Sequence, residues 1–196
     1  MAEGSRPVFF YDLGSPYAYL AAERVHAVFA EAGGQPPEWQ PILLGGLFQR
    51  FGRDSWANGP DRDAGVREVE RRASAYGLPP LDWPQPFPGN TLVAMRAATY
   101  AKEIGRAPSF SLAAFRQAFA AGRDLTEPDN VLLAAAAAEM HPRALLSAIE
   151  RDSIKRKLRE ATERAGDRGV RGVPAIVIGE RVFWGDDRLE EAAALS

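Results

Sequence analysis

The sequence predicts an α/β fold in which a long helical segment interrupts a small sheet. Short runs of aromatic and β-branched residues lie near both ends of the chain, and helical periodicity fills the middle. The elements therefore follow the order βαβ, helices, ββα. At 196 residues and 46% hydrophobic, the chain is long enough for a well-filled core. We expect a discontinuous sheet domain of residues 1–44 plus 166–196 and an inserted all-helical domain of residues 45–165.

The first part of the chain has a strand, helix, strand pattern. Residues 8–11 (VFFY) are an aromatic and β-branched run that suits a buried strand. Apolar residues then recur at helical spacing, with Pro16 at the expected first helical position and Gly33-Gly34 at the end. A second strand is expected over residues 38–43, which completes the opening half of a parallel α/β unit.

The middle of the chain is predicted to consist of successive helices. Each combines an apolar stripe with a capping residue or a terminating glycine. The expected helices cover, approximately, residues 66–76, 91–104, 112–119, 131–140, a segment opened by Pro142, and 154–165.

The C-terminal part returns to strands. Residues 175–178 (AIVI) and 181–184 (RVFW) flank Gly179-Glu180, a two-residue connection whose leading glycine suits a type II′ hairpin turn. A last helix is expected from Asp187 to Leu195, which completes the ββα order.

Composition excludes several kinds of site. The chain contains no cysteine, which removes disulfides, thiolate metal sites and dithiol redox chemistry. Its two histidines, His26 and His141, have no obvious serine or acidic partner, so neither a hydrolase triad nor a transition-metal centre is expected.

Charge and hydropathy bear on partners and location. A net charge of −2 leaves no basic excess for nucleic acid or anionic membrane surfaces. The N-terminus shows no leader pattern, and the longest apolar run, residues 131–138, is far shorter than a membrane span. We expect a soluble cytoplasmic protein that acts on a small molecule.

Four stretches carry a family resemblance. They are residues 10–17 (FYDLGSPY), 41–48 (PILLGGLF), 125–128 (LTEP), and 172–174 (GVP) followed by 183–188 (FWGDDR). In this order and spacing, the chain resembles the DsbA-related family that includes 2-hydroxychromene-2-carboxylate isomerases and kappa-class glutathione transferases. The resemblance implies a thioredoxin-like domain with a helical insertion, a homodimer, and a glutathione site between the two domains.

Ser15 is the predicted catalytic residue. In thioredoxin-like folds this corner normally carries a Cys-x-x-Cys pair, whereas this chain has Ser15-Pro16-Tyr17-Ala18. The N–H groups and partial positive charge of a helix N-terminus favour an anion, and a hydroxyl there can donate to the sulfur of a bound thiol as it ionises. The alternative is that Ser15 only caps the helix, and one residue can do both.

Val173-Pro174 is the second predicted element. In thioredoxin-like folds the matching proline is cis, which leaves the N–H and C=O of the preceding residue free to pair with the backbone of a thiol ligand. The alternative is that Pro174 only begins an edge strand.

Asp186 and Asp187 are the third element. By resemblance, the turn that contains them holds the amino and carboxyl ends of the γ-glutamyl group, since a carboxylate suits the ammonium and helix N–H groups suit the carboxylate. The alternative for Asp187 is a capping box with Glu190, three residues later.

The remaining site residues are Arg53 and four aromatic residues. Family members commonly have Gly-Asn where this chain has Gly52-Arg53, and arginine could bind a carboxylate as a fork. The cofactor is therefore expected to be glutathione or another low-molecular-weight thiol, with no metal. The aromatic side chains could form an apolar pocket for a planar ring, with core packing as the alternative. They are Tyr17, Phe48, Phe51 and Trp56.

The resulting hypothesis is a thiol-dependent isomerase of the 2-hydroxychromene-2-carboxylate isomerase type. Addition of the bound thiolate to an activated double bond of an aromatic-degradation intermediate would allow rotation, and elimination would restore the alkene. Two alternatives use the same fold. One is a kappa-type glutathione transferase or peroxidase, or a DsbA-family oxidoreductase-like protein, and the other is a non-catalytic thioredoxin-fold binding module.

Overall fold

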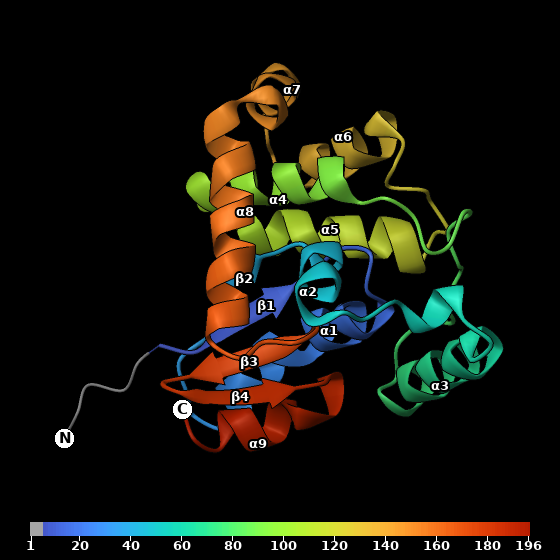
Figure 1. Ribbon diagram of the computed structural model, residues 1–196, viewed down its shortest axis with the longest axis vertical. Coiled ribbons are helices and arrows are strands. Elements are labelled where there is room, and N and C mark those ends of the chain that lie inside the picture. The colour runs from blue at the N-terminus through green and yellow to red at the C-terminus, as the bar shows by residue number, and fades with distance from the viewer. Residues whose placement is uncertain (1–5) are drawn as a thin grey trace.

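The computed structural model describes residues 6–196, and residues 1–5 of the predicted sheet domain lie outside this range. Within it, four strands form one mixed sheet in the order β2-β1-β3-β4 (Figure 1). β1 (Val8–Tyr11) runs parallel to β2 (Glu38–Pro41) and antiparallel to β3 (Ala175–Ile178), which pairs with β4 (Arg181–Trp184). The two ends of the chain therefore build one sheet, which confirms the predicted α/β class and the predicted order of elements along the chain.

The central position of β1 explains its aromatic sequence. Phe9 and Tyr11 are fully buried and stack with ring centroids 5.5 Å apart, while Trp39 of β2 meets Phe9 edge-on at 5.0 Å. Burying a side chain of this size contributes roughly 2–3 kcal/mol. α1 (Pro16–Glu31) and α9 (Leu189–Ala193) pack against each other, and α9 lies next to β3 and β4 (Figure 1).

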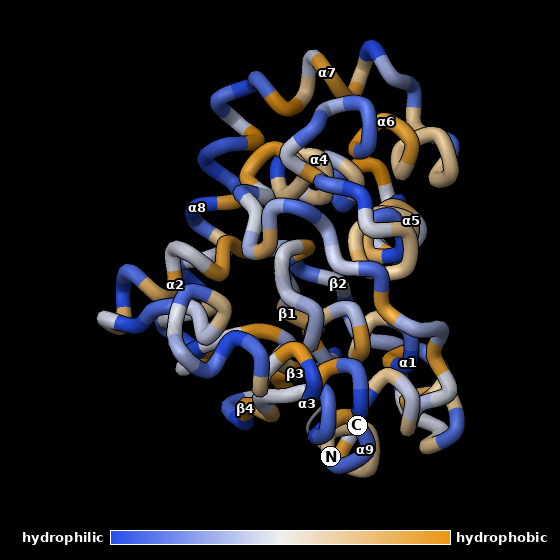
Figure 2. Tube along the Cα trace, turned by 90° about the vertical axis from the view of Figure 1, so that its right-hand side faces the viewer, coloured by the Kyte–Doolittle hydropathy of each residue, from blue (hydrophilic) through white to orange (hydrophobic). Residues whose placement is uncertain are grey.

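Most of the helical segment lies on the β2 side of the sheet, from α4 (Leu92–Glu103) to α8 (Asp152–Asp167), whereas its α3 (Arg62–Ala75) lies beside α1 (Figure 1). Its helices pack through small side chains, as in α4, where Ala94, Ala97 and Ala98 are fully buried. Figure 2 shows α8 alternating between hydrophilic and hydrophobic residues, as expected for a helix with one buried face. The helices of this segment are α2 (Leu44–Phe51), η1 (Trp56–Asn58), α3 (Arg62–Ala75), α4 (Leu92–Glu103), α5 (Ala107–Phe119), α6 (Pro128–Ala137), α7 (Pro142–Glu150) and α8 (Asp152–Asp167).

Local sequence signals predicted most helix and strand ends to within a few residues of their positions in the structure. Asn90 accepts a hydrogen bond from the Leu92 N–H at 3.0 Å at the start of α4, close to the expected cap. Gly179 has φ 58°, which fits a type II′ turn between β3 and β4. The predicted boundary between residues 165 and 166 falls inside α8, so the proposed division into two domains stays a prediction.

The last predicted helix is shorter than expected. Its first turn is a 3-10 turn, η2 (Asp186–Arg188), and the α-helix begins only at Leu189. The backbone carbonyl of Asp186 accepts a hydrogen bond from Arg24 at 3.2 Å, and the Asp186 side chain is bound by Arg72 of α3 and by Tyr76, which directly follows that helix. No helix within residues 6–196 has both the length and the hydrophobicity needed to cross a bilayer.

Candidate active site

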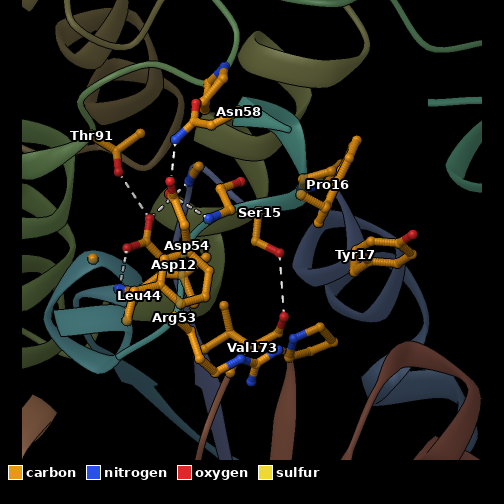
Figure 3. A pocket seen from close by; sticks show the side chains of 18 of the residues that line it. Asp12, Ser15, Pro16, Tyr17, Leu44, Arg53, Asp54, Asn58, Thr91 and Val173 are labelled. Carbon is orange, nitrogen blue, oxygen red and sulfur yellow. Dashed lines mark hydrogen bonds between the residues drawn. The ribbon is translucent and has the colours of Figure 1, made fainter. Parts of the chain in front are cut away.

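A cavity of about 860 Å³ opens where α1 begins, between the helical segment and the loops that border β3 and β4. This volume is typical of sites for small molecules. Most predicted site residues, although far apart in sequence, line it together (Figure 3). These lining residues are Ser15, Tyr17, Phe48, Arg53, Trp56, Val173, Pro174, Asp186 and Asp187.

Ser15 caps α1 and faces the cavity. Its Oγ accepts a hydrogen bond from the Ala18 N–H at 3.2 Å, which confirms the capping interpretation. The hydroxyl donates to the Val173 carbonyl oxygen at 3.4 Å, and the side chain is 4% exposed. Because 3.4 Å is long for an O–H···O bond, the hydrogen can turn to a better acceptor in the cavity while the oxygen continues to cap the helix. Contact with a thiol stays a prediction.

The Val173–Pro174 peptide bond is cis, as expected from the resemblance. The expectation that the Val173 carbonyl is free is wrong, because this oxygen accepts the Ser15 hydroxyl (Figure 3). The Val173 N–H, in contrast, has no hydrogen-bond partner among residues 6–196. Val173 therefore offers a backbone donor beside Ser15.

Asp186 is engaged within the protein. It is 1% exposed, and its carboxylate accepts hydrogen bonds from Arg72 Nη1 at 2.9 Å and the Tyr76 hydroxyl at 2.8 Å. Burial raises the pKa of this carboxyl, while the Tyr76 hydrogen bond and the Arg72 charge oppose the rise. Both oxygens are thus occupied, and the side chain joins α3 to the wall of the cavity instead of presenting a free charge.

Asp187 has a different environment. Its side chain is 56% exposed and lines the cavity, with Oδ2 3.6 Å from Arg72 Nη1. The alternative capping box is not formed, because α9 begins after Arg188 without a side-chain cap and Glu190 pairs instead with Arg24. The Asp187 carboxylate is therefore accessible to a ligand cation.

Arg53 lines the cavity and contacts Arg171 and Trp184. Its Nη1 donates to the Arg171 carbonyl oxygen at 3.2 Å, and its Cζ lies 4.9 Å from the centre of the Trp184 ring. Trp184 also lines the cavity. Sequence reasoning did not single out Trp184 as a site residue, although it belongs to the family stretch 183–188, and an aromatic residue just before a ligand-binding turn was the available signal.

The predicted aromatic pocket forms in part. Tyr17 and Trp56 meet edge-to-face at 6.1 Å, and both line the cavity with Phe48. Burial raises the pKa of Tyr17, so its hydroxyl stays protonated at neutral pH. Phe51 is not among the lining residues: its ring centre lies 5.6 Å from the Arg171 guanidinium, and the side chain packs against the core just before Gly52 ends α2.

Asp12 is a lining residue that sequence reasoning missed. Its Oδ1 accepts hydrogen bonds from the Gly14 N–H and the Thr91 hydroxyl, each at 2.9 Å, and its Oδ2 accepts the Leu44 N–H at 2.8 Å (Figure 3). Burial raises the pKa of the carboxyl despite these donors. Asp12 thus ties the end of β1 to the starts of α2 and α4. The signal was an acidic residue that directly follows a fully apolar strand.

Asp54 and Asn58 also line the cavity and were not predicted. Asp54 Oδ1 accepts hydrogen bonds from the Ser55 N–H at 2.6 Å and from Asn58 Nδ2 at 3.0 Å. These donors lower the pKa of Asp54, with the Asn58 hydrogen bond the larger cause. Within residues 6–196, no group of three or more His, Cys, Asp or Glu side chains is arranged to hold a metal ion.

The sheet order, the serine at the start of α1 and the cis proline beside it define a thioredoxin-like fold with a helical insertion. The model of the DSBA-like thioredoxin domain matches residues 8–195, and the chain belongs to this family. This confirms the resemblance found in the sequence.

Two relatives align over nearly the whole chain. One is the 2-hydroxychromene-2-carboxylate isomerase of Sphingobium xenophagum, 27% identical over 185 residues that cover 93% of each chain. The other is glutathione S-transferase kappa 1 of Rattus norvegicus, 28% identical over 201 residues that cover 95% of this chain and 88% of the transferase. Both relatives are enzymes.

Solved structures show the same fold. A 2-hydroxychromene-2-carboxylate isomerase superposes with a TM-score of 0.83 at 22% identity, covering 96% of this chain and 93% of that one. A probable DsbA oxidoreductase from Streptomyces coelicolor superposes with a TM-score of 0.72 at 20% identity, covering 97% and 89%.

Proposed function

We propose that this protein is a thiol-dependent isomerase of the 2-hydroxychromene-2-carboxylate isomerase type. The observation that carries the proposal is the Ser15 hydroxyl, which faces the cavity at the N-terminus of α1 in a chain without cysteine. A nucleophilic sulfur at this corner must come from a bound molecule. The isomerase and the kappa-class transferase among the relatives support this assignment.

The residues at the corner fit a small thiol. The helix N-terminus favours a negative charge, the Val173 N–H can pair with a peptide carbonyl of the ligand, and the exposed Asp187 can receive an ammonium. When bound, the thiol supplies the nucleophile whose reversible addition converts a substrate double bond into a bond that can rotate.

Ser15 has the central chemical role in this proposal. Its hydroxyl turns from the Val173 carbonyl to the sulfur and donates to it, while the N-terminus of α1 stabilises the same negative charge. Both effects lower the pKa of the thiol and hold it in one direction. Tyr17, Phe48 and Trp56 then provide the apolar wall against which a planar substrate lies.

A spectrophotometric isomerisation assay with and without thiol tests the proposal. Purified protein is mixed with 2-hydroxychromene-2-carboxylate and either glutathione, another natural thiol, or none. We expect turnover that depends on a thiol and on Ser15. Turnover at the same rate without any thiol would contradict the proposed role of the cofactor, and no isomerisation with any thiol would contradict the proposed reaction.

A kappa-type glutathione transferase or peroxidase is the second candidate. The 28% identity to glutathione S-transferase kappa 1 favours it, and the same sulfur would attack a different electrophile. Conjugation of glutathione to a chloronitrobenzene, or peroxide reduction, would identify this activity. A thermal-shift titration separates both enzymes from a module that binds no thiol, since a thiol that binds the folded protein should raise the unfolding temperature further as its concentration exceeds the Kd.

A further inference from the structure

Two arginines line the cavity, and only one of them has an ionic partner among residues 6–196. Arg72 pairs with Asp186, and Asp12 is enclosed by hydrogen-bond donors. Arg53, which lines the same cavity, forms no salt bridge with any residue in the described range 6–196. Because a guanidinium is always charged at neutral pH, Arg53 places a positive charge outside any salt bridge on this wall, and the carboxylate of the neighbouring Asp54 accepts hydrogen bonds from Ser55 and Asn58 instead.

The guanidinium of Arg53 is held from two directions. One N–H donates to the Arg171 carbonyl oxygen, and the guanidinium lies near the ring of Trp184, with Cζ 4.9 Å from the ring centre. These contacts fix the head group without neutralising it and use one of its five N–H donors. The remaining donors stay available to an anion.

Gly172 is required for this arrangement. A Cβ atom at residue 172 would lie 2.9 Å from the indole atoms of Trp184, so a larger residue would displace the ring. Trp184 is 47% exposed, and it lines the cavity with Arg53. The exposed indole serves as a flat support for the guanidinium.

The guanidinium of Arg53 lies beside Val173, which is predicted to pair with the peptide backbone of the thiol. Arg171, which anchors it, directly precedes Gly172 and Val173, and Figure 3 shows Arg53 extending toward Val173. The exposed carboxylate of Asp187 belongs to the turn after β4 and lines the same cavity. A ligand with its sulfur at Ser15 therefore meets both a cation and an accessible carboxylate.

Given the thiol-dependent function proposed above, on which this inference rests, we propose that Arg53 is a specificity-determining residue that binds a free carboxylate of the thiol. A guanidinium fork pairs with a carboxylate through two parallel hydrogen bonds, and an ester cannot reproduce that charged pair. With Asp187, it selects thiols that carry an ammonium at one end and a free carboxylate at the other end. Thiols whose carboxyl end is blocked bind poorly.

Calorimetric titration with glutathione and with its glycyl ethyl ester tests this selection. Both probes have the same sulfur and ammonium, and only the ester lacks the charged carboxyl end of the glycine. The native protein should bind glutathione about tenfold more tightly than the ester. Arg53→Gln should bind the two probes equally, by weakening glutathione binding and leaving ester binding unchanged.

Arg50→Gln is the matched control. Arg50 lies three residues before Arg53, is exposed, pairs with Asp167, and is not among the residues that line the cavity. Its variant should keep the full preference for glutathione, which separates recognition at Arg53 from a general effect of positive charge. Arg53→Lys keeps the charge without the fork, and a reduced preference is expected. The comparison of the two probes on the native protein needs no variant.

Several outcomes would overturn the inference while leaving the proposed function intact. They are equal binding of both probes by the native protein, and an undiminished preference in Arg53→Gln. Another is a change in Arg53→Gln confined to the KM of a carboxylated electrophile, since the carboxylate would then belong to the second substrate. Failure of the native protein to bind any thiol would instead refute the thiol-dependent function itself.

Discussion

The Ser15 hydroxyl donates a hydrogen bond to the Val173 carbonyl oxygen across 3.4 Å, joining two positions 158 residues apart. The Ser15 Oγ atom also accepts a hydrogen bond from the Ala18 N–H and thereby caps α1. The position of the hydroxyl therefore depends on both the helix start and the cis Val173–Pro174 segment. A serine held in this way can donate its hydrogen bond to a ligand instead of to Val173, while its oxygen continues to cap the helix.

Substitutions of Ser15 should separate catalysis from capping. Loss of an N-cap serine costs about 1 kcal/mol of stability with alanine but only a few tenths with glycine. If the hydroxyl stabilises the thiolate, Ser15→Ala and Ser15→Gly should both lower kcat by about a hundredfold. Isomerisation rates and thermal unfolding are measured on the same preparations.

The glycine variant is the decisive control for this prediction. Near-native stability combined with near-native turnover in Ser15→Gly would show that the serine acts only as a helix cap. Equal activity losses in variants of unequal stability would exclude partial unfolding as the cause.

The adjacent acids Asp186 and Asp187 should respond differently to the same substitution. Asp187→Asn removes an exposed charge from the cavity and should raise the thiol concentration for half-maximal rate about three- to tenfold, with little change in stability. Asp186→Asn breaks a buried pair with Arg72 and should lower the free energy of unfolding by about 2 kcal/mol. Thiol-dependent kinetics and urea unfolding measure the two effects.

A reversal of this pattern would reassign the two residues. If Asp187→Asn destabilised the protein and left the thiol dependence unchanged, the carboxylate would be structural. If Asp186→Asn affected only thiol binding, its carboxylate would have to leave Arg72 and contact the ligand.

Asp12 should make stability depend on pH in a defined direction. Burial raises the pKa of its carboxyl, so the folded protein holds this proton more tightly than the unfolded chain does. Its contribution to stability is full below the ordinary carboxyl pKa, about 4, and is lost as the pH rises through the raised value. The Asn side chain in Asp12→Asn has no proton to lose, so the free energy of unfolding of the variant should rise relative to that of the native protein as the pH rises.

Urea unfolding of both proteins between about pH 4 and pH 7 tests this sign. The other carboxyls titrate alike in the two proteins, and the difference in free energy isolates Asp12. A difference that stays constant, or that moves in favour of the native protein as the pH rises, would show that the donors from Gly14, Leu44 and Thr91 outweigh burial.

Phe48 and Phe51 form a matched pair for the substrate pocket. They lie one turn apart on α2, but only Phe48 is among the residues that line the cavity. Phe48→Leu should change the substrate KM by roughly threefold or more, because an aromatic contact with a planar ring is lost. Phe51→Leu should leave KM unchanged. An equal effect of both substitutions on KM would place Phe51 at the substrate as well.

Local sequence patterns predicted the elements that position the site. The apolar run of residues 8–11, Pro16 at the start of α1 and Gly179 in the hairpin each act through neighbouring residues, so they could be read without the fold. The same patterns could not show which acid near β4 is exposed. That distinction depends on Arg72 and Tyr76, which reach Asp186 from a helix more than a hundred residues earlier, with sequence separations of 114 and 110.

The sequence by itself determined the α/β order, the serine at the start of the first helix and the absence of any cysteine, because these are properties of composition and short-range pattern. Only the tertiary structure decided the state of each charge in the cavity. It enclosed Asp12, paired Asp186, left Asp187 exposed and placed Arg53 against Trp184 without an ionic partner among residues 6–196. The reason is physical: burial and pairing depend on which distant segments meet in space, and a charge pattern along the chain does not specify that.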